Sequence, residues 1–327
     1  MIVAVDAAGG DYYPQNPVKG AIEAVEENNE LTVILVGPED IIKEELANHE
    51  YDKKRVLIHD APQVIGMDES PGQAVKTKQQ SSIVVGVGLH KAGKCDAFVS
   101  AGNTGALLAA SMFILGKLPG VLRPTIAAYY PTFKGFRLLV DAGANLEIKP
   151  ETALQFAKMG SVFCEQILDI SNPKVGLLNV GEEEAKGTEL LKEVHKELKS
   201  LDSFVGNLEG KDIFPGKADV YVCDGMVGNI VLKFGESIPD MLEKMIGMAV
   251  QKMELSSEEV QRTQKILKTA LSSFNYENVG GIPFLGVNGV SVVGHGGSSP
   301  LAIKNMIKSA VQTVEQDVNG KIVASLN

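Results

Sequence analysis

The sequence predicts an α/β fold with a mostly parallel sheet. Two observations lead to this class. Apolar runs of strand length alternate along the chain with segments of helical periodicity, as in proteins with right-handed strand–helix–strand crossovers. Four of these runs end in loops of small residues with Asn, Asp or Ser, and continuous apolar runs are typical of buried parallel strands. Because no low-complexity linker or repeat interrupts the pattern, we expect a single domain over residues 1–327.

The first third of the chain alternates regularly between the two kinds of element. The pattern predicts strands at 2–5, 31–36 and 56–59 and helices at 17–27, 39–46 and 70–90. Gly37-Pro38 ends the second strand, and Ser70-Pro71 begins the third helix because proline is favoured in the first helical turn. The alternation continues to about residue 235.

A segment without strands follows at 238–274, and we predict that it forms a helical hairpin excursion. Its first helix has apolar residues, four of them Met, at spacings of three and four. A serine cap followed by acids at 255–259 begins the second helix. A glycine-dense stretch at 280–299, which includes a strand at 290–293, and a last helix at 300–317 complete the predicted fold.

Composition narrows the class of protein. The 327 residues are 44% apolar and have a net charge of −10, without a strongly basic block, which argues against nucleic acid as a partner. The three cysteines are far apart and predict reduced thiols in an intracellular core. No CxxC motif or His/Cys cluster suggests a metal. The first residues lack the charged and apolar regions of a signal peptide, and no apolar stretch is long enough to span a membrane. We therefore expect a soluble, cytoplasmic protein.

A turn of small residues follows the first strand and contains Asp6, Gly9, Gly10 and Asp11. It fits a phosphate-binding turn and a simple tight turn equally well. The GxGxxG fingerprint is absent, the second strand does not end in an acid that would bind a ribose, and no GxxxxGK[ST] motif occurs. These features argue against a nicotinamide or ATP site, and we expect no cofactor.

The loops that follow the four apolar runs contain most of the other candidate ligand-binding residues. In open α/β sheets, ligands bind at the carboxyl ends of strands, so we expect the four loops to converge on one crevice. Amide groups and polar side chains at a helix start form a neutral anion site, although the same residue types cap helices. The candidates in the loops 100–105 and 141–145 are Ser100, Asn103, Thr104, Asp141 and Asn145.

The other two loops add charged candidates. Lys186 lies four residues after Glu182, which predicts either a surface ion pair or a positive charge for a phosphate. Asp224, at a strand end, is placed to accept a proton or orient a nucleophile, or to cap a helix. Asn229 and Lys233 follow it and lie one helical turn apart.

One histidine stands out from the other four. His295 lies between two glycines after the strand at 290–293, where the backbone can approach a ligand closely. A core histidine and a surface histidine are the alternatives. The remaining histidines lie among charged residues and are predicted to be at the surface; they are His49, His59, His90 and His195.

Taken together and in order, these segments resemble the bacterial phosphate acyltransferase family of phospholipid synthesis. The resemblance runs from residue 2 to about residue 310 without a missing block. Each motif is modest alone, but the ordered set is highly specific. The segments are 6–11, 100–106, 141–145, 179–187, Gly206-Asn207 with the three residues that follow, 219–233 and 280–289.

The resemblance implies an α/β/α fold of the phosphotransacetylase and isocitrate dehydrogenase type, a homodimer and loose membrane association. The family moves a fatty acyl group from acyl carrier protein to inorganic phosphate, and the acyl phosphate feeds an integral-membrane glycerol-3-phosphate acyltransferase. We predict catalytic roles for Lys186, Asp224, Asn229 and His295. The other candidates, with Asn207 and Lys233 among them, are predicted to bind substrate.

The residues agree with this chemistry. A thioester is already activated, so a phosphate held beside it can attack the acyl carbon directly. Asn103, Thr104 and Asn145 are candidate donors to the oxyanion, and Lys186 and Lys233 can offset the phosphate charge. Neither a Ser/His/Asp order nor a reactive-cysteine context indicates an acyl-enzyme.

Two other functions remain open at this point. One is an oxidoreductase similar to the β-decarboxylating dehydrogenases, which needs an arginine cluster and acids for a metal; the four arginines are spread through the chain. The other is a non-catalytic protein that binds acyl carrier protein or lipid. The hairpin at 238–274 likewise has two interpretations: weak contact with a membrane surface or an acyl chain, to which Met is suited, or ordinary packing in a dimer or core.

Overall fold

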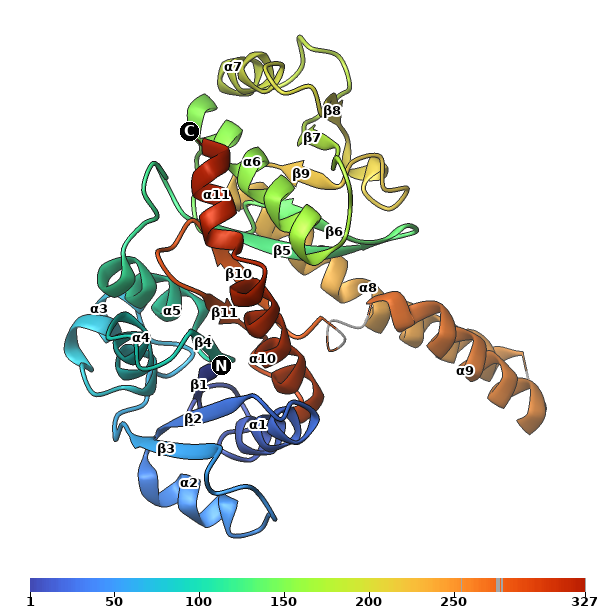
Figure 1. Cartoon of the computed structure of the whole chain (residues 1–327). Coiled ribbons are helices and arrows are strands. Elements are labelled where there is room, and N and C mark those ends of the chain that lie inside the picture. Colours follow the sequence, from blue (N-terminus) through green and yellow to red (C-terminus); the bar gives the residue numbers. More distant parts are fainter. Residues whose placement is uncertain (254, 275–276, 278, 327) are drawn as a thin grey trace.

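The computed structural model describes residues 1–253, 255–274, 277 and 279–326 (Figure 1). Within these residues, eleven strands form one sheet in the order β3-β2-β1-β4-β11-β10-β5-β6-β9-β7-β8. The strands are β1 (Ile2–Asp6), β2 (Thr32–Gly37), β3 (Val56–Asp60), β4 (Ala97–Ser100), β5 (Thr125–Thr132), β6 (Gly135–Val140), β7 (Val175–Leu178), β8 (Phe204–Leu208), β9 (Val220–Val222), β10 (Ile282–Leu285) and β11 (Ser291–Val293).

Helices follow most of these strands. They are α1 (Gln15–Glu27), α2 (Glu39–Leu46), α3 (Pro71–Thr77), α4 (Ser82–Lys91), α5 (Thr104–Ala110), α6 (Pro150–Ile167), α7 (Glu189–Leu198), α8 (Gly225–Lys252), α9 (Ser257–Leu271), α10 (Pro300–Glu315) and α11 (Val318–Leu326). A π-helical turn at Ser111–Leu115 continues α5, and short 3₁₀ turns lie at Gly210–Asp212 and Ser272–Phe274.

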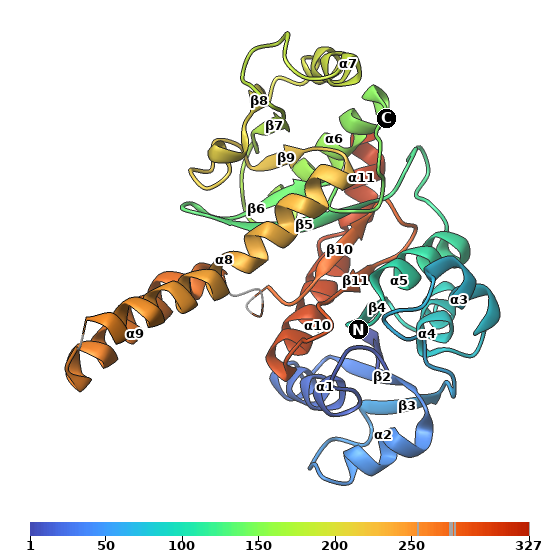
Figure 2. The ribbon, with the colours of Figure 1, turned by 180° about the vertical axis from the view of Figure 1, so that it is seen from behind.

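Helices cover both faces of the sheet, which confirms the predicted three layers. Along β1, Val3 and Val5 belong to the core that contains α1 and α10, whereas Ala4 belongs to the core that contains α3, α4 and α5. Successive residues of a strand point to opposite faces, so an uninterrupted apolar run is buried on both sides. In the second half of the chain, α6, α7 and α11 pack on one face of β6, β7 and β9 (Figures 1 and 2).

The strand directions reverse in the middle of the sheet. The pairs β11–β10, β10–β5 and β5–β6 are antiparallel, while the pairs on either side are parallel. The sheet is therefore mostly parallel, as predicted, but β6, β7, β8 and β9 run opposite to β1–β4. Because of this reversal, the carboxyl end of β4 lies at the opposite sheet edge from those of β6, β7 and β9, so a shared edge cannot be the reason for the four loops to converge on one crevice.

One predicted helix is interrupted, and another ends within two residues of its predicted end. The segment predicted as one helix at 70–90 is α3 and α4, because the Ser81 hydroxyl accepts a hydrogen bond from the Val84 amide (3.4 Å) and begins a new helix. The segment at 300–317 is α10, and a separate helix α11 follows it. Asp317 has a φ of 47°, a conformation that ends a helix.

The predicted hairpin is part of a longer arm, formed by α8 and α9. The first helix begins at Gly225 rather than at residue 238, because the Asp224 carboxylate accepts a hydrogen bond from the Val227 amide (2.8 Å). It continues through Pro239, and the capping box of Ser256 and Glu259 then begins α9. The two helices extend away from the body (Figures 1 and 2), and none of the described residues of α9 is buried.

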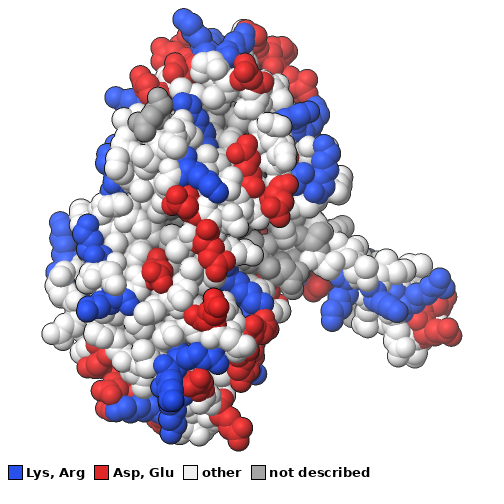
Figure 3. Space-filling model, viewed as in Figure 1, with Lys and Arg blue, Asp and Glu red and all other residues white. Residues whose placement is uncertain are grey.

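Both signs of charge are interspersed over the face of the molecule shown in Figure 3, and the arm carries both signs as well. Among the described residues, no helix has the length and apolar character needed to cross a membrane. Cys95, Cys164 and Cys223 are buried free thiols. Burial raises the pKa of the Cys95 thiol to about 11, so this cysteine is protonated at neutral pH.

Candidate active site

Asp6 and Ser100 join the first turn to the loop after β4. The Ser100 hydroxyl donates a hydrogen bond to the Asp6 carboxylate (2.6 Å) and accepts one from the Gly102 amide (3.0 Å). Both side chains are buried, and burial raises the pKa of Asp6, an effect that its hydrogen bonds partly offset. The pair is therefore placed to hold two loops together rather than to meet a ligand in solvent.

The rest of the first turn packs against the loop that contains His295. A Cβ atom at Gly9 would lie 2.4 Å from an Asp6 carboxylate oxygen, so only glycine fits there. Gly10 has a φ of 93°, and the Asp11 amide donates a hydrogen bond to the Gly296 carbonyl (2.8 Å). The structure thus brings the predicted residues of the turn and the His295 loop together.

His295 is exposed, and its tautomer follows from its neighbours. The Gly297 amide donates a hydrogen bond to Nδ1 of His295 (3.1 Å), so Nδ1 has no proton when the ring is neutral. The proton is then on Nε2, which is the hydrogen-bond donor of the neutral ring. This geometry suits a donor to a developing oxyanion.

Asn103 is a helix cap. Its Oδ1 accepts a hydrogen bond from the Ala106 amide (3.0 Å), and its Nδ2 contacts the carbonyl oxygens of Gly66, Met67 and Glu69 at 3.1–3.2 Å. An oxyanion role for Asn103 would require these bonds to break, so the structure favours the cap alternative. Thr104, by contrast, is exposed at the first position of α5.

Asp141 organises the loop after β6. Its carboxylate accepts hydrogen bonds from the amides of Ile126, Gly143, Ala144 and Asn145 and from the Asn145 side chain, at 2.6–3.3 Å. The Asn145 amide group also donates to the Pro124 carbonyl (2.9 Å). Asp141 is fully buried, so this carboxylate holds the loop and is not accessible to a substrate.

The start of α8 packs directly on this loop. The Gly225 amide donates to the Asn145 carbonyl (2.7 Å), and Nδ2 of Asn229 donates to the Ala142 carbonyl (3.3 Å). A Cβ atom at Gly228 would lie 1.8 Å from the Asp141 carbonyl oxygen. The close approach of α8 to the loop therefore depends on a glycine at this position.

α8 continues from this loop with two charged residues. Lys233 is exposed one turn after Asn229, and Glu236 follows it on the same helix. Burial raises the pKa of Glu236, and the charges of His295 and Lys233 offset part of this rise. The helix therefore brings Glu236, which sequence reasoning missed, into the electrostatic neighbourhood of His295.

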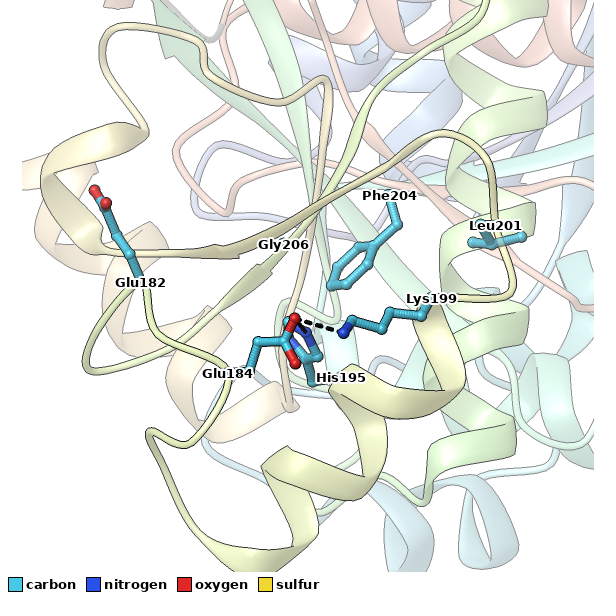
Figure 4. A pocket seen from close by; sticks show the side chains of 7 residues that line it. All are labelled: Glu182, Glu184, His195, Lys199, Leu201, Phe204 and Gly206. Carbon is cyan, nitrogen blue, oxygen red and sulfur yellow. Dashed lines mark hydrogen bonds and ion pairs between the residues drawn. The ribbon is translucent and has the colours of Figure 1, made fainter.

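A third cluster lies beside β7 and β8, at the end of the sheet. Nδ2 of Asn207 donates to the Glu183 carbonyl (2.9 Å), and its Oδ1 lies 2.8 Å from Nδ1 of His195, so it accepts that proton. His195 was predicted at the surface, but it is buried. With Glu184 and Lys199 it lines a cavity of about 240 Å³, shown in Figure 4.

Lys186 and Glu182 do not form the predicted surface pair, because residues 179–188 are not helical. Lys186 lies 4.0 Å from Glu183 instead, and half of its side chain is exposed. Glu182 points away from His195 in Figure 4 and lies 3.4 Å from Lys217. No hydrogen bond or ion pair recorded among the described residues joins this cluster to the His295 group.

A larger cavity, of about 380 Å³, lies beside the loop 141–145. One wall comes from α5 and its π-helical extension, which follow the loop 100–105, and another comes from the loop 141–145. The lining residues are Leu108, Met112, Lys117, Leu122, Arg123, Pro124, Ala144 and Asn145. Sequence reasoning missed Lys117 and Arg123; the only signal was an Arg-Pro pair immediately before an apolar strand.

The family model for fatty acid synthesis proteins matches residues 1–321. The chain belongs to this family. It is 47% identical to the phosphate acyltransferase of Chlorobaculum parvum, over 100% of this chain and 99% of the relative. It is 42% identical to the phosphate acyltransferase of Halothermothrix orenii, over 100% and 99% of the two chains. The resemblance stated from the motifs is confirmed, and the protein is an acyltransferase of fatty acid and phospholipid synthesis.

Solved structures confirm the fold. A phosphotransacetylase from Streptococcus pyogenes matches with a TM-score of 0.61 and 16% identity, over 95% of this chain and 94% of that one. A 4-hydroxythreonine-4-phosphate dehydrogenase from Klebsiella pneumoniae matches with a TM-score of 0.56 and 13% identity, over 96% and 99%. The fold thus occurs in transferases and dehydrogenases alike, and membership of the family, not the fold, decides between these two classes.

Proposed function

We propose that this enzyme transfers a fatty acyl group from acyl carrier protein to inorganic phosphate, without a metal or a cofactor. A phosphate oxygen attacks the thioester carbon and forms a C–O bond. The C–S bond then breaks, and the leaving thiolate takes up the proton that phosphate gives up. The products are acyl phosphate and the free thiol of the carrier. The observation that supports this best is the full-length match to phosphate acyltransferases.

The site geometry supports direct attack rather than an acyl-enzyme. Cys223, the cysteine nearest the 141–145 loop, is buried, and burial raises its pKa well above the ordinary value. A protonated, buried thiol is a poor nucleophile. His295 is an exposed candidate donor to the oxyanion, and Lys233 offers a positive charge for phosphate from α8.

We assign most of the other predicted site residues to three groups. Asp224 and Asn229 fix the start of α8 against the 141–145 loop, and so position Lys233. Lys186 is an exposed cation on a separate loop, and its proposed role is to attract phosphate. Asp6, Ser100, Asp141 and Asn207 support the loops through buried hydrogen bonds.

For the arm, we propose contact with the membrane surface, where a membrane glycerol-3-phosphate acyltransferase would receive the acyl phosphate. Met241, Met245 and Met248 are about half exposed on α8, and α9 offers no buried residue among those described. The mixed charge of the arm makes attraction to anionic lipid weak, so binding would depend on apolar area. A cytoplasmic homodimer is part of the same proposal, and packing of these Met residues in the dimer is the alternative.

The test measures thiol release from acylated carrier protein with and without phosphate. We expect release to require phosphate, to persist in EDTA and to leave NAD unreduced. Loss of activity in EDTA, or reduction of NAD during turnover, would contradict the proposed reaction. Stable binding of the acylated carrier without turnover would favour the binding-protein alternative.

A further inference from the structure

The 380 Å³ cavity combines a cationic rim with an apolar wall. Lys117 and Arg123 are exposed, and no acidic residue lines the cavity, although the chain has a net charge of −10. Leu108 and Met112 are half-buried in its wall, and 47% of the Leu122 side chain is exposed. The volume lies in the range of cavities that hold small organic ligands.

The two cations differ in what they contact. Nζ of Lys117 donates to the Leu122 carbonyl (2.9 Å), which ties the ends of the loop before β5 together. The Arg123 side chain makes no hydrogen bond or ion pair with any described residue. An exposed guanidinium that is unpaired in this part of the chain can bind a phosphate with two parallel hydrogen bonds.

The cavity also lies next to the groups proposed for the reaction. Asn145 lines it, and the carbonyl of the same residue accepts the hydrogen bond from Gly225 at the start of α8. The opposite wall is α5 with its π-helical turn, and such turns occur frequently at functional sites. A ligand in the cavity would therefore contact elements from both halves of the molecule.

We propose that this cavity binds an apolar chain that ends in a phosphate group, with Arg123 as the phosphate contact and Leu108, Met112 and Leu122 against the chain. The ligand class rests on the proposed function, because acyl phosphate has this chemistry. Inorganic phosphate lacks the chain, the fatty acyl chain of the thioester substrate ends at sulfur rather than at a phosphate, and the phosphopantetheine arm has its phosphate on a polar chain. The proposal therefore assigns the cavity to the product rather than to either substrate group.

The experiment measures binding of dodecyl phosphate, a non-reactive chain with a terminal phosphate, to the full-length protein by calorimetry. We expect Arg123→Ala to weaken binding by about tenfold or more, the scale of a lost charge-assisted hydrogen bond, and Arg123→Lys to weaken it less. Met112→Ala should weaken the binding of dodecyl phosphate, because it removes apolar contact with the chain. The binding of inorganic phosphate should not change. Lys19→Ala, which removes an exposed cation from α1, is the matched control and should bind as the unchanged protein does.

Two outcomes would overturn the proposal. One is equal binding of dodecyl phosphate by the Arg123→Ala variant and the unchanged protein. The other is a loss of phosphopantetheine binding that matches the loss of dodecyl phosphate binding, which would assign the cavity to the carrier arm. Thiol release with phosphate is measured separately on the unchanged protein. If dodecyl phosphate binding depends on Arg123 but no phosphate-dependent thiol release is found, the binding site stands and the proposed reaction is rejected.

Discussion

The loop 141–145 and the loop before β5 lie on the same cavity but are built in opposite ways. In the first, the fully buried Asp141 carboxylate accepts hydrogen bonds from four backbone amides and one side chain. In the second, Arg123 extends from the chain without a bond to the described residues. The first loop has a clear sequence pattern and the second has almost none. The comparison teaches that small residues with Asp or Asn mark a turn that bonds to itself, whereas a side chain left unpaired, such as Arg123, has no comparable sequence pattern.

The largest effect should come from breaking the closed loop. Asp141→Ala leaves several buried amides without an acceptor, and each such group costs about 1–3 kcal/mol. We therefore expect the free energy of unfolding in urea to fall by roughly 3 kcal/mol or more. Arg123→Ala, the control from the open loop, should change it by less than about 0.5 kcal/mol. Equal losses in the two variants would remove the distinction between the loops.

A second prediction tests an exposed cation away from the cavity. Lys186→Ala should raise the KM for phosphate, or lower kcat/KM, by about tenfold or more, as expected for a lost charge-assisted hydrogen bond of ~1.5–3 kcal/mol. Lys192→Ala, which removes a surface cation paired with Glu189 on α7, is the control. An unchanged phosphate dependence in the Lys186 variant would leave this residue as part of a surface ion pair.

The arm is a second exposed region, and its exposed Met residues add apolar surface to its mixed charges. Changing Met245 and Met248, each about half exposed, to Gln should release the protein from liposomes. The dimer and the activity on soluble substrate should remain, because α9 and the outer part of α8 extend away from the site. Loss of the dimer in light scattering would show instead that these positions pack against a second copy.

The smallest effect concerns an exposed charge on α1. Glu27 lies 2.5 Å from Lys304 and also pairs with Lys308, and these lysines lower its pKa from 4.5 to about 2. A lowered pKa stabilises the fold above pH 4.5, and this stabilisation is lost as the pH falls toward 2. Glu27→Gln should therefore be slightly less stable than the unchanged protein at neutral pH, with the difference vanishing near pH 2. A difference that is constant with pH would mean that the ion pairs do not contribute.

Much of the fold could be predicted from local pattern. The strands β1 and β2 were placed within one residue, because each is a continuous apolar run that ends at an acid or glycine. The reversal in the sheet could not be predicted. It arises because β10 and β11 insert between β4 and β5, and the local sequence does not indicate which strands pair with each other. The start of α8 was missed because Asp224 was weighed as a site residue while its role as cap decides the helix boundary.

The candidate site was predicted less well, and the reason is physical. The sequence pattern identified residues that stabilise loops, such as Asp6, Asn103 and Asp141. Their short polar side chains accept hydrogen bonds from nearby backbone amides. A single cation such as Arg123 has no such local signature. Its position on a cavity beside Asn145 is evident only in the folded structure.

The most direct test of the account is the product of the reaction. Phosphorus NMR of the protein with acylated carrier and phosphate should show one acyl phosphate formed for each thioester lost. The rate should rise with phosphate concentration and then saturate. Thioester loss without acyl phosphate, or at a rate independent of phosphate, would contradict direct transfer to phosphate.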